Sequence, residues 1–249
     1  MTICVISQPT YLPWIGYFDL IDQADFFVFL DTVQFQKRSW QQRNRIRTNK
    51  GTLWLTMPAV TRSRYFQKIN EVRIADPRCL ERHLESIRHS YAKSDLFNET
   101  YPFIRDLLRY HAGETLLCKI NTEIIKSICA YLSISTPMLM ASDLKTTGSR
   151  SELLAAICQE VGADIYLSTS GAICYLVDDR PYYTFKGLEI RIHGYSHPEY
   201  TQVHGEFLPY MSILDLILNT GNASLDIIRS GRTTNKPITE IISDYAHGT

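Results

Sequence analysis

The first 31 residues alternate between short apolar runs and one segment of helical spacing, and this order restricts the fold more than any other feature. The apolar run Ile3–Ile6 ends at Gln8-Pro9, and proline cannot continue a central strand. Apolar residues then recur every three positions between 12 and 24, as on a helix, and Phe26–Leu30 is a second apolar run. The opening therefore predicts a strand, a helix and a second strand with a short crossover.

The same alternation continues later in the chain and predicts the fold class. Met138 opens a second unit, with a helix that ends at Gly162 and a strand over 164–167, and Glu189–His193 is a further strand. Strands separated by helices predict an α/β fold, Rossmann-like, with a mostly parallel sheet and helices on both faces. Helical spacing over residues 76–132 predicts a helical insertion between the two halves of the sheet. At 249 residues, we expect a single domain spanning 1–249.

Composition narrows the class of protein. None of the six cysteines forms a CxxC pair and most lie in apolar runs, which favours buried thiols over disulfides or a zinc site. No signal peptide opens the sequence and no apolar run reaches the roughly 18 residues of a membrane span, so we expect a cytoplasmic location. The formal net charge of +0 argues against a general nucleic-acid binder. Neither a metal site nor an oligomeric state is indicated.

Polar residues follow both strands of the first unit. Gln8 comes directly after the first strand and Asp31 after the second. In an open parallel sheet, ligands bind beyond the carboxyl ends of the strands, which makes both residues candidates for a site. The alternative is that they only cap strands and turns.

The segment that follows Asp31 has a strong excess of positive charge. Its nine basic residues lie between Thr32 and Asn70, where no acidic residue occurs: Lys37, Arg38, Arg43, Arg45, Arg47, Lys50, Arg62, Arg64 and Lys68. Such an excess attracts a phosphate, a nucleotide or a nucleic acid, and Trp40 and Trp54 could stack on a base. Asn44 adds donors and acceptors beside the guanidinium groups of Arg43 and Arg45, which suits recognition of phosphate or carboxylate. The alternative is a solvated basic face with two core tryptophans.

Two later features are weaker candidates. Ser170 and Gly171 follow the strand over 164–167, where small residues can bring backbone N–H groups close to a phosphate, although a tight turn explains them equally. His197 is the best candidate for acid–base chemistry, because the pKa of a free imidazole lies near neutrality. A histidine in a loop can instead serve only as a hydrogen-bonding residue.

Several stretches, in the same order, resemble the WbqC-like protein family over Ile3 to about Gly221. They read QPTYLPWIGYF, SWQQRNRI, GADIYLSTSGAICYL and YSHPEYTQ. Members are bacterial and often belong to gene sets for O-antigen (lipopolysaccharide) and other surface polysaccharides. The resemblance implies a transferase or ligase that attaches an amino acid such as glycine, or another acyl group, to the amine of a nucleotide-linked amino sugar. The chain departs from the pattern at Ser7, where members often carry histidine.

The first unit is also similar to adenylate-forming nucleotidyltransferases. In those proteins a short polar motif at a helix start binds the phosphates of ATP, and this would add ATP with magnesium as a cofactor. Their motif contains histidines, whereas Gln8-Pro9-Thr10-Tyr11 has none.

The implied reaction assigns expected roles to the candidates. Asp31 or His197 would take a proton from the attacking ammonium, and Arg43 and Arg45 would hold phosphates. Gln8, Tyr11 and Asn44 would orient the substrate. The remaining expected substrate contacts are Trp14, Gln34, Arg38, Ser170, Gly171, Tyr200 and Gln202.

Two other functions stay open. A glycosyltransferase is one, but the sequence has no Asp-x-Asp metal motif, and the adjacent Asp178 and Asp179 fall in an expected loop. A non-catalytic protein that binds a sugar nucleotide or nucleic acid is the other, and it would bind without turnover.

Overall fold

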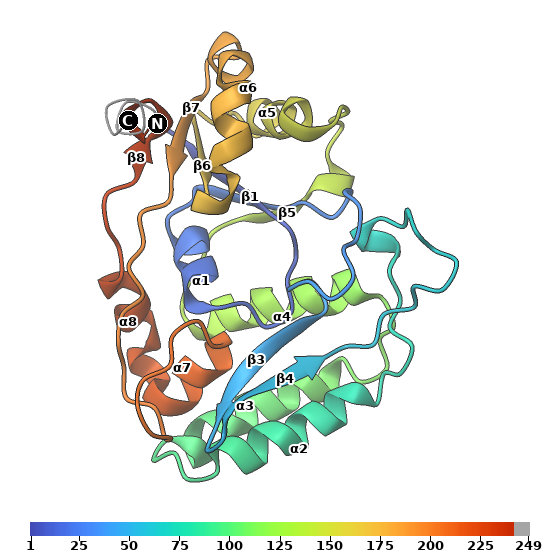
Figure 1. Cartoon of the computed structure of the whole chain (residues 1–249), viewed down its shortest axis with the longest axis vertical. Coiled ribbons are helices and arrows are strands. Elements are labelled where there is room, and N and C mark those ends of the chain that lie inside the picture. Colours follow the sequence, from blue (N-terminus) through green and yellow to red (C-terminus); the bar gives the residue numbers. More distant parts are fainter. Residues whose placement is uncertain (242–249) are drawn as a thin grey trace.

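Six strands form one sheet in the computed structural model, which describes residues 1–241 (Figure 1). In spatial order they are β5 (Met138–Met140), β2 (Phe26–Phe29), β1 (Ile3–Ser7), β6 (Ile165–Ser168), β7 (Glu189–Ile192) and β8 (Lys236–Pro237). The first five are parallel, and β8 pairs antiparallel with β7. The expected α/β class is confirmed. Residues 242–249 of the expected domain span lie outside the described residues.

The strand order creates a crevice beside β1. The chain runs outward from β1 to β2 and β5, and then returns to β6 on the other side of β1. This is the Rossmann order, in which neighbouring strands lead to connections on opposite faces and leave a crevice at their carboxyl ends. Register places Val5 beside both Phe27 and Leu167, so Ser7 and Ser168 end at the same edge of the sheet.

Alternate strand residues pack against helices on both faces of the sheet. Val5, Phe27 and Leu167 point into the cluster that includes α1 (Ile15–Asp22) and α4 (Leu117–Tyr131). Cys4, Val28 and Tyr166 point to the opposite face and join the cluster that includes α5 (Arg150–Glu160) and α6 (Ile173–Phe185). Two-residue alternation of buried side chains explains why the strands read as continuous apolar runs.

One expectation fails at α6. Asp178 and Asp179 lie on this helix and not in a loop. They interrupt the apolar spacing on which a sequence-based helix prediction depends, so the segment carried little helical signal.

A second layer is inserted between β2 and β5. It contains the antiparallel hairpin β3 (Arg43–Thr48) and β4 (Gly51–Thr56), and the helices α2 (Cys79–Tyr91) and α3 (Phe97–Tyr110) before α4 (Figure 1). The helices predicted within 76–132 are present. The sequence pattern did not indicate β3, because every second residue of this strand is an arginine and the apolar half of the alternation is short.

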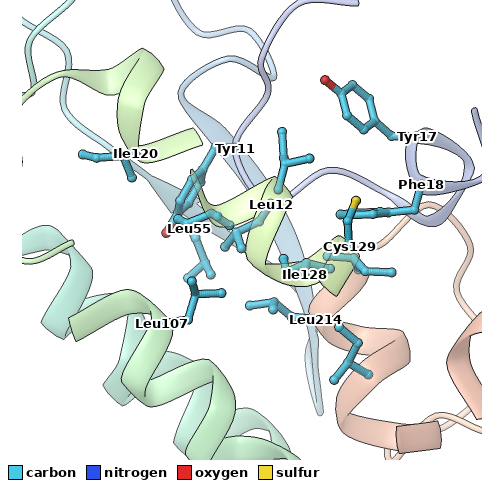
Figure 2. Close-up of a cluster of buried hydrophobic side chains, with 14 of the residues drawn as sticks. Tyr11, Leu12, Tyr17, Phe18, Leu55, Leu107, Ile120, Ile128, Cys129 and Leu214 are labelled. Carbon is cyan, nitrogen blue, oxygen red and sulfur yellow. The ribbon is translucent and has the colours of Figure 1, made fainter. Parts of the chain in front are cut away.

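The loop after β1 joins the two layers. Figure 2 shows Tyr11 and Leu12 of this loop packed near Leu55 of β4, Ile120 of α4 and Leu214 of α7 (Ile213–Thr220). Leu12 is fully buried and has a positive φ of 46°. A leucine keeps this conformation only where packing outweighs the backbone strain, so the core fixes the path of the loop.

The remaining elements are short. Helix α8 covers Ser224–Ser230, and 3-10 turns cover Ile69–Glu71, Ala141–Asp143, Ser170–Ala172 and Gly221–Ala223. All six cysteines are unpaired and five are buried, the exception being Cys174. Within residues 1–241 the structure has no helix that is long and apolar enough to cross a membrane.

Candidate functional site

A cavity of about 380 Å³ opens where β1 and β6 end. Ser7 and Thr169 form its floor at the strand ends, and Arg45 contributes a side wall from the hairpin. A smaller cavity of about 200 Å³ shares Ser7 and Thr169 and extends to Gln8. We call the two together the switch-point cavity, because they lie at the crevice that the strand order creates.

Aromatic side chains form a large part of the cavity wall. Trp14, Tyr17, Trp40 and Tyr210 all line it. The rings of Trp14 and Tyr210 lie 5.4 Å apart. Trp14 directly precedes α1, and its ring also stacks on His197, with centroids 6.0 Å apart. Such walls suit a ligand with flat or apolar faces, such as a sugar ring or a base.

Arg45 supplies the positive charge of the cavity. Its Nε donates to the carbonyl of Tyr210 at 3.4 Å, and within residues 1–241 no carboxylate lies within ion-pair distance of it. Its guanidinium therefore keeps its capacity for an anionic ligand.

The two neighbouring outward arginines of β3 are already engaged. The guanidinium of Arg43 lies 4.4 Å from the ring centroid of Trp54 and does not line the cavity. Arg47 donates to the carbonyls of Gly51, His204 and Glu206, which connects the hairpin to the segment before α7. Of the three arginines, only Arg45 lines the cavity.

Gln8 and Asn44 reach the cavity, and Tyr11 does not. The Gln8 side-chain oxygen accepts a bond of 2.7 Å from Gln41 Nε2. Asn44 is buried and donates to the carbonyls of Tyr11 and Leu12, at 3.2 and 2.7 Å. Tyr11 is fully buried in the core of Figure 2, and its hydroxyl bonds to His83 Nδ1 at 2.8 Å.

Asp31 is a buried carboxylate that organises loops. Its Oδ1 accepts from the N–H of Ser142 at 3.0 Å, and its Oδ2 accepts from Asn70 Nδ2 at 3.2 Å. It does not line either part of the switch-point cavity. Gln34 and Arg38 lie further along the same loop, exposed and outside the cavity lining.

His197 lies behind the aromatic wall and both its ring nitrogens are occupied. Nδ1 donates to the carbonyl of Pro198 at 2.9 Å, and Nε2 accepts from the N–H of Tyr210 at 3.1 Å. Burial lowers the pKa of this imidazole from its ordinary value, which favours the neutral ring. The arrangement holds Tyr210 and Trp14 in place.

The remaining candidates from the C-terminal half of the chain lie either in the core or at the surface. Tyr200 and Gln202 both donate to the buried carboxylate of Asp215, at 2.8 and 2.7 Å, and neither lines the cavity. Ser170 and Gly171 are exposed in the turn that leads into α6, next to Thr169 of the cavity floor.

The structure also brings together a pair that the sequence did not reveal. Nε2 of His193 donates to Oδ2 of Asp19 at 2.7 Å, and the side chains are 5% and 0% exposed. Among residues 1–241 no hydrogen bond reaches His193 Nδ1, and the N–H of His193 donates to the carbonyl of Ser168, which lines the smaller part of the cavity; His193 itself lines neither part. The position of His193 at the end of β7 was the only signal in the sequence, since Asp19 lies 174 residues away.

Within the described part of the chain, no group of three or more His, Cys, Asp or Glu side chains could hold a metal ion. The polar side chains that line the two parts of the cavity include Arg45, Asn44, Gln8, Ser7, Thr10, Ser168 and Thr169.

Comparison with known proteins adds a family and a relative. The sequence model of the WbqC-like protein family matches residues 8–227. The uncharacterised protein Rv1507c of Mycobacterium tuberculosis (strain H37Rv) is 35% identical over 227 residues, which cover 90% of this chain and 96% of that protein. No solved structure matches the chain.

Proposed function

Because the chain belongs to the WbqC-like protein family, we propose that it acts on a nucleotide-linked amino sugar in the synthesis of a surface polysaccharide. The reaction attaches an amino acid such as glycine, or another acyl group, to the amine of the sugar. The nucleotide sugar binds in the switch-point cavity.

The observation that carries this proposal is the placement of Arg45 in an aromatic cavity at the strand-order reversal. A sugar nucleotide combines an anionic diphosphate with a sugar ring and a base. Among residues 1–241 the guanidinium of Arg45 has no carboxylate partner, and Trp14 and Trp40 offer ring faces within the same cavity. Open α/β sheets bind nucleotides at this position.

The chemical step needs a proton acceptor. The sugar ammonium must lose a proton before its nitrogen attacks the acyl carbon; the new C–N bond then forms as the bond to the acyl carrier breaks. We assign the proton to Nδ1 of His193, which lines neither part of the cavity but whose backbone N–H bonds to Ser168 of the cavity lining, because Asp19 holds the Nε2 proton and so orients the ring. Asp31 and His197 are less suitable, since both already serve backbone N–H and carbonyl groups.

Binding is the first test. We expect a UDP- or dTDP-linked amino sugar, at about a hundredfold excess over its dissociation constant, to stabilise the protein by about 2.7 kcal/mol in a thermal-shift assay. Arg45→Gln should weaken binding about tenfold or more, because a hydrogen bond to a charged group contributes about 1.5–3 kcal/mol. Arg43→Gln is the matched control and should bind normally. Equal binding by both variants would show that the nucleotide sugar does not bind in the switch-point cavity.

Turnover is the second test. Wild-type protein, incubated with the amino sugar nucleotide, glycine and ATP with magnesium, should form an amide detectable by mass spectrometry. His193→Asn should retain binding and lose most of the product.

A non-catalytic sugar-nucleotide binding protein is the second candidate. It is favoured by the occupied hydrogen bonds of Asp31 and His197, the two acid–base candidates of the sequence. Binding without an amide product for any acyl donor, including donors carried on a protein or on tRNA, would select it.

A further inference from the structure

The segment between β4 and α2 presents two adjacent aromatic side chains to solvent. Tyr65 is 72% exposed and Phe66 is 85% exposed. The segment extends to the right-hand edge of the view in Figure 1, away from the helices that cover the sheet. We call residues 62–66 the aromatic tip.

The base of the tip is well ordered by hydrogen bonds. Gln67 is buried and its Nε2 donates to the carbonyl of Val60 at 3.0 Å, while the carbonyl of Gln67 accepts from the N–H of Phe35 at 3.0 Å. Gln34 Nε2 donates to the carbonyl of Tyr65 at 2.9 Å. These bonds fix the backbone that carries both aromatic rings. Exposing two adjacent rings to solvent does not stabilise the fold, so their exposure calls for another explanation.

Positive charge surrounds the tip. Five basic residues belong to the aromatic tip or to neighbouring loop segments: Lys37, Arg38, Arg62, Arg64 and Lys68. The ammonium of Lys37 lies 5.4 Å from the ring centroid of Tyr65. The nearest acidic residue in sequence is Glu71, whose carboxylate accepts from the N–H of Lys68. Among residues 1–241 no ion pair involves any of these five cations.

We propose that the aromatic tip docks this protein on an anionic lipid surface. Tyr65 and Phe66 would enter the boundary between headgroups and acyl chains, where aromatic rings are favoured, and the cations would contact lipid phosphates. A projecting tip with two outward rings fits a planar partner better than a nucleic acid, which would need a groove. The surface is separate from the switch-point cavity, so the two proposals can fail independently.

Co-sedimentation with vesicles tests the proposal. Wild-type protein should sediment with vesicles that contain phosphatidylglycerol and stay in solution with phosphatidylcholine alone, and added salt should weaken binding because exposed charges are screened. The double variant R62Q/R64Q should bind at least tenfold more weakly, because each basic residue near an anionic surface contributes about 1 kcal/mol. The double variant Y65S/F66S should also bind at least tenfold more weakly, because it removes both interfacial rings.

The matched control is Tyr110→Ser, since Tyr110 is 85% exposed on α3 and lies outside the basic segment. It should sediment like the wild type. Unchanged urea unfolding of every variant would exclude misfolding. The proposal is overturned if wild-type protein ignores anionic vesicles, if all variants bind equally, or if the same substitutions abolish binding of single-stranded DNA while vesicle binding persists.

Discussion

The imidazole of His83 shows how burial decides the charge of a single residue. Its Nε2 donates to the carbonyl of Thr56 at 3.2 Å, and its Nδ1 accepts from the hydroxyl of Tyr11. Burial lowers the pKa of His83 to about 4 from an ordinary value of 6.5. The neutral ring connects the loop after β1 to β4 and α2.

This shift makes stability depend on pH in a defined window. Between pH 6.5 and about 4 the unfolded chain holds a proton on His83 that the folded chain does not. The contribution of neutral His83 to the free energy of unfolding is complete above pH 6.5. It falls by about 3 kcal/mol in total as the pH drops toward 4. We expect urea unfolding of wild-type protein to show this loss, and the pH profile of His83→Leu to lack it.

The control is His89→Leu on the same helix, because His89 is exposed. Its profile should run parallel to that of the wild type. Parallel profiles for His83→Leu as well would show that another group causes the dependence.

At the scale of elements, one amide of α4 holds the loops that form the cavity. Asn121 is fully buried, and its Nδ2 donates to the carbonyl of Pro9 at 3.2 Å and to that of Gln41 at 2.7 Å. These two loops carry Gln8 and Trp40, both cavity residues. A helix on one face of the sheet thus sets the position of the cavity wall.

Loss of this amide should affect both stability and binding. Asn121→Ala leaves two carbonyl groups without their donor, and we expect the free energy of unfolding to fall by about 1–3 kcal/mol. Affinity for the nucleotide sugar should fall too, because Gln41 orients Gln8. Lys119→Ala, on the exposed side of α4, should cost less than about 1 kcal/mol. Urea unfolding and calorimetry measure the two effects, and equal costs for both variants would contradict the assignment.

At the scale of the whole molecule, charged pairs join the two ends of the chain. Arg232 Nε donates to Asp19 Oδ1 at 2.6 Å, and Arg232 also contacts Asp22. Arg229 Nε donates to Asp22 Oδ2 at 2.8 Å. The two arginines differ in their partners, since Arg232 contacts both Asp19, which is fully buried, and Asp22, whereas among residues 1–241 Arg229 forms an ion pair only with Asp22 and is itself 46% exposed.

This difference predicts unequal costs of removal. Arg232→Met leaves the buried carboxylate of Asp19 without its cation, and we expect a loss of about 3 kcal/mol in the free energy of unfolding. Arg229→Met removes a partly exposed cation whose partner Asp22 still contacts Arg232, and it should cost about 1 kcal/mol or less. Chemical unfolding of both variants measures the difference. Similar losses would mean that Gln23 and His193, which also donate to Asp19, suffice to hold its charge.

The sequence by itself determined the α/β class and the strands β1 and β2, and it predicted a site at the carboxyl ends of these strands. These depend on local periodicity and on polar residues at strand ends, which a linear pattern contains. The excess of basic residues after Asp31 likewise indicated an anionic ligand, and Arg45 and Asn44 do line the cavity. The sequence also supported the family, which the comparisons confirmed.

Only the tertiary structure decided which candidate side chains remain available. Tyr11, Asp31 and His197 looked like site residues, but each has partners from distant segments: His83, Asn70 and Tyr210. Availability depends on burial and on hydrogen bonds between residues far apart in the chain, and no local pattern records these. For the same reason Arg45 could not be told from Arg47, nor His193 from His197, before the fold placed their partners.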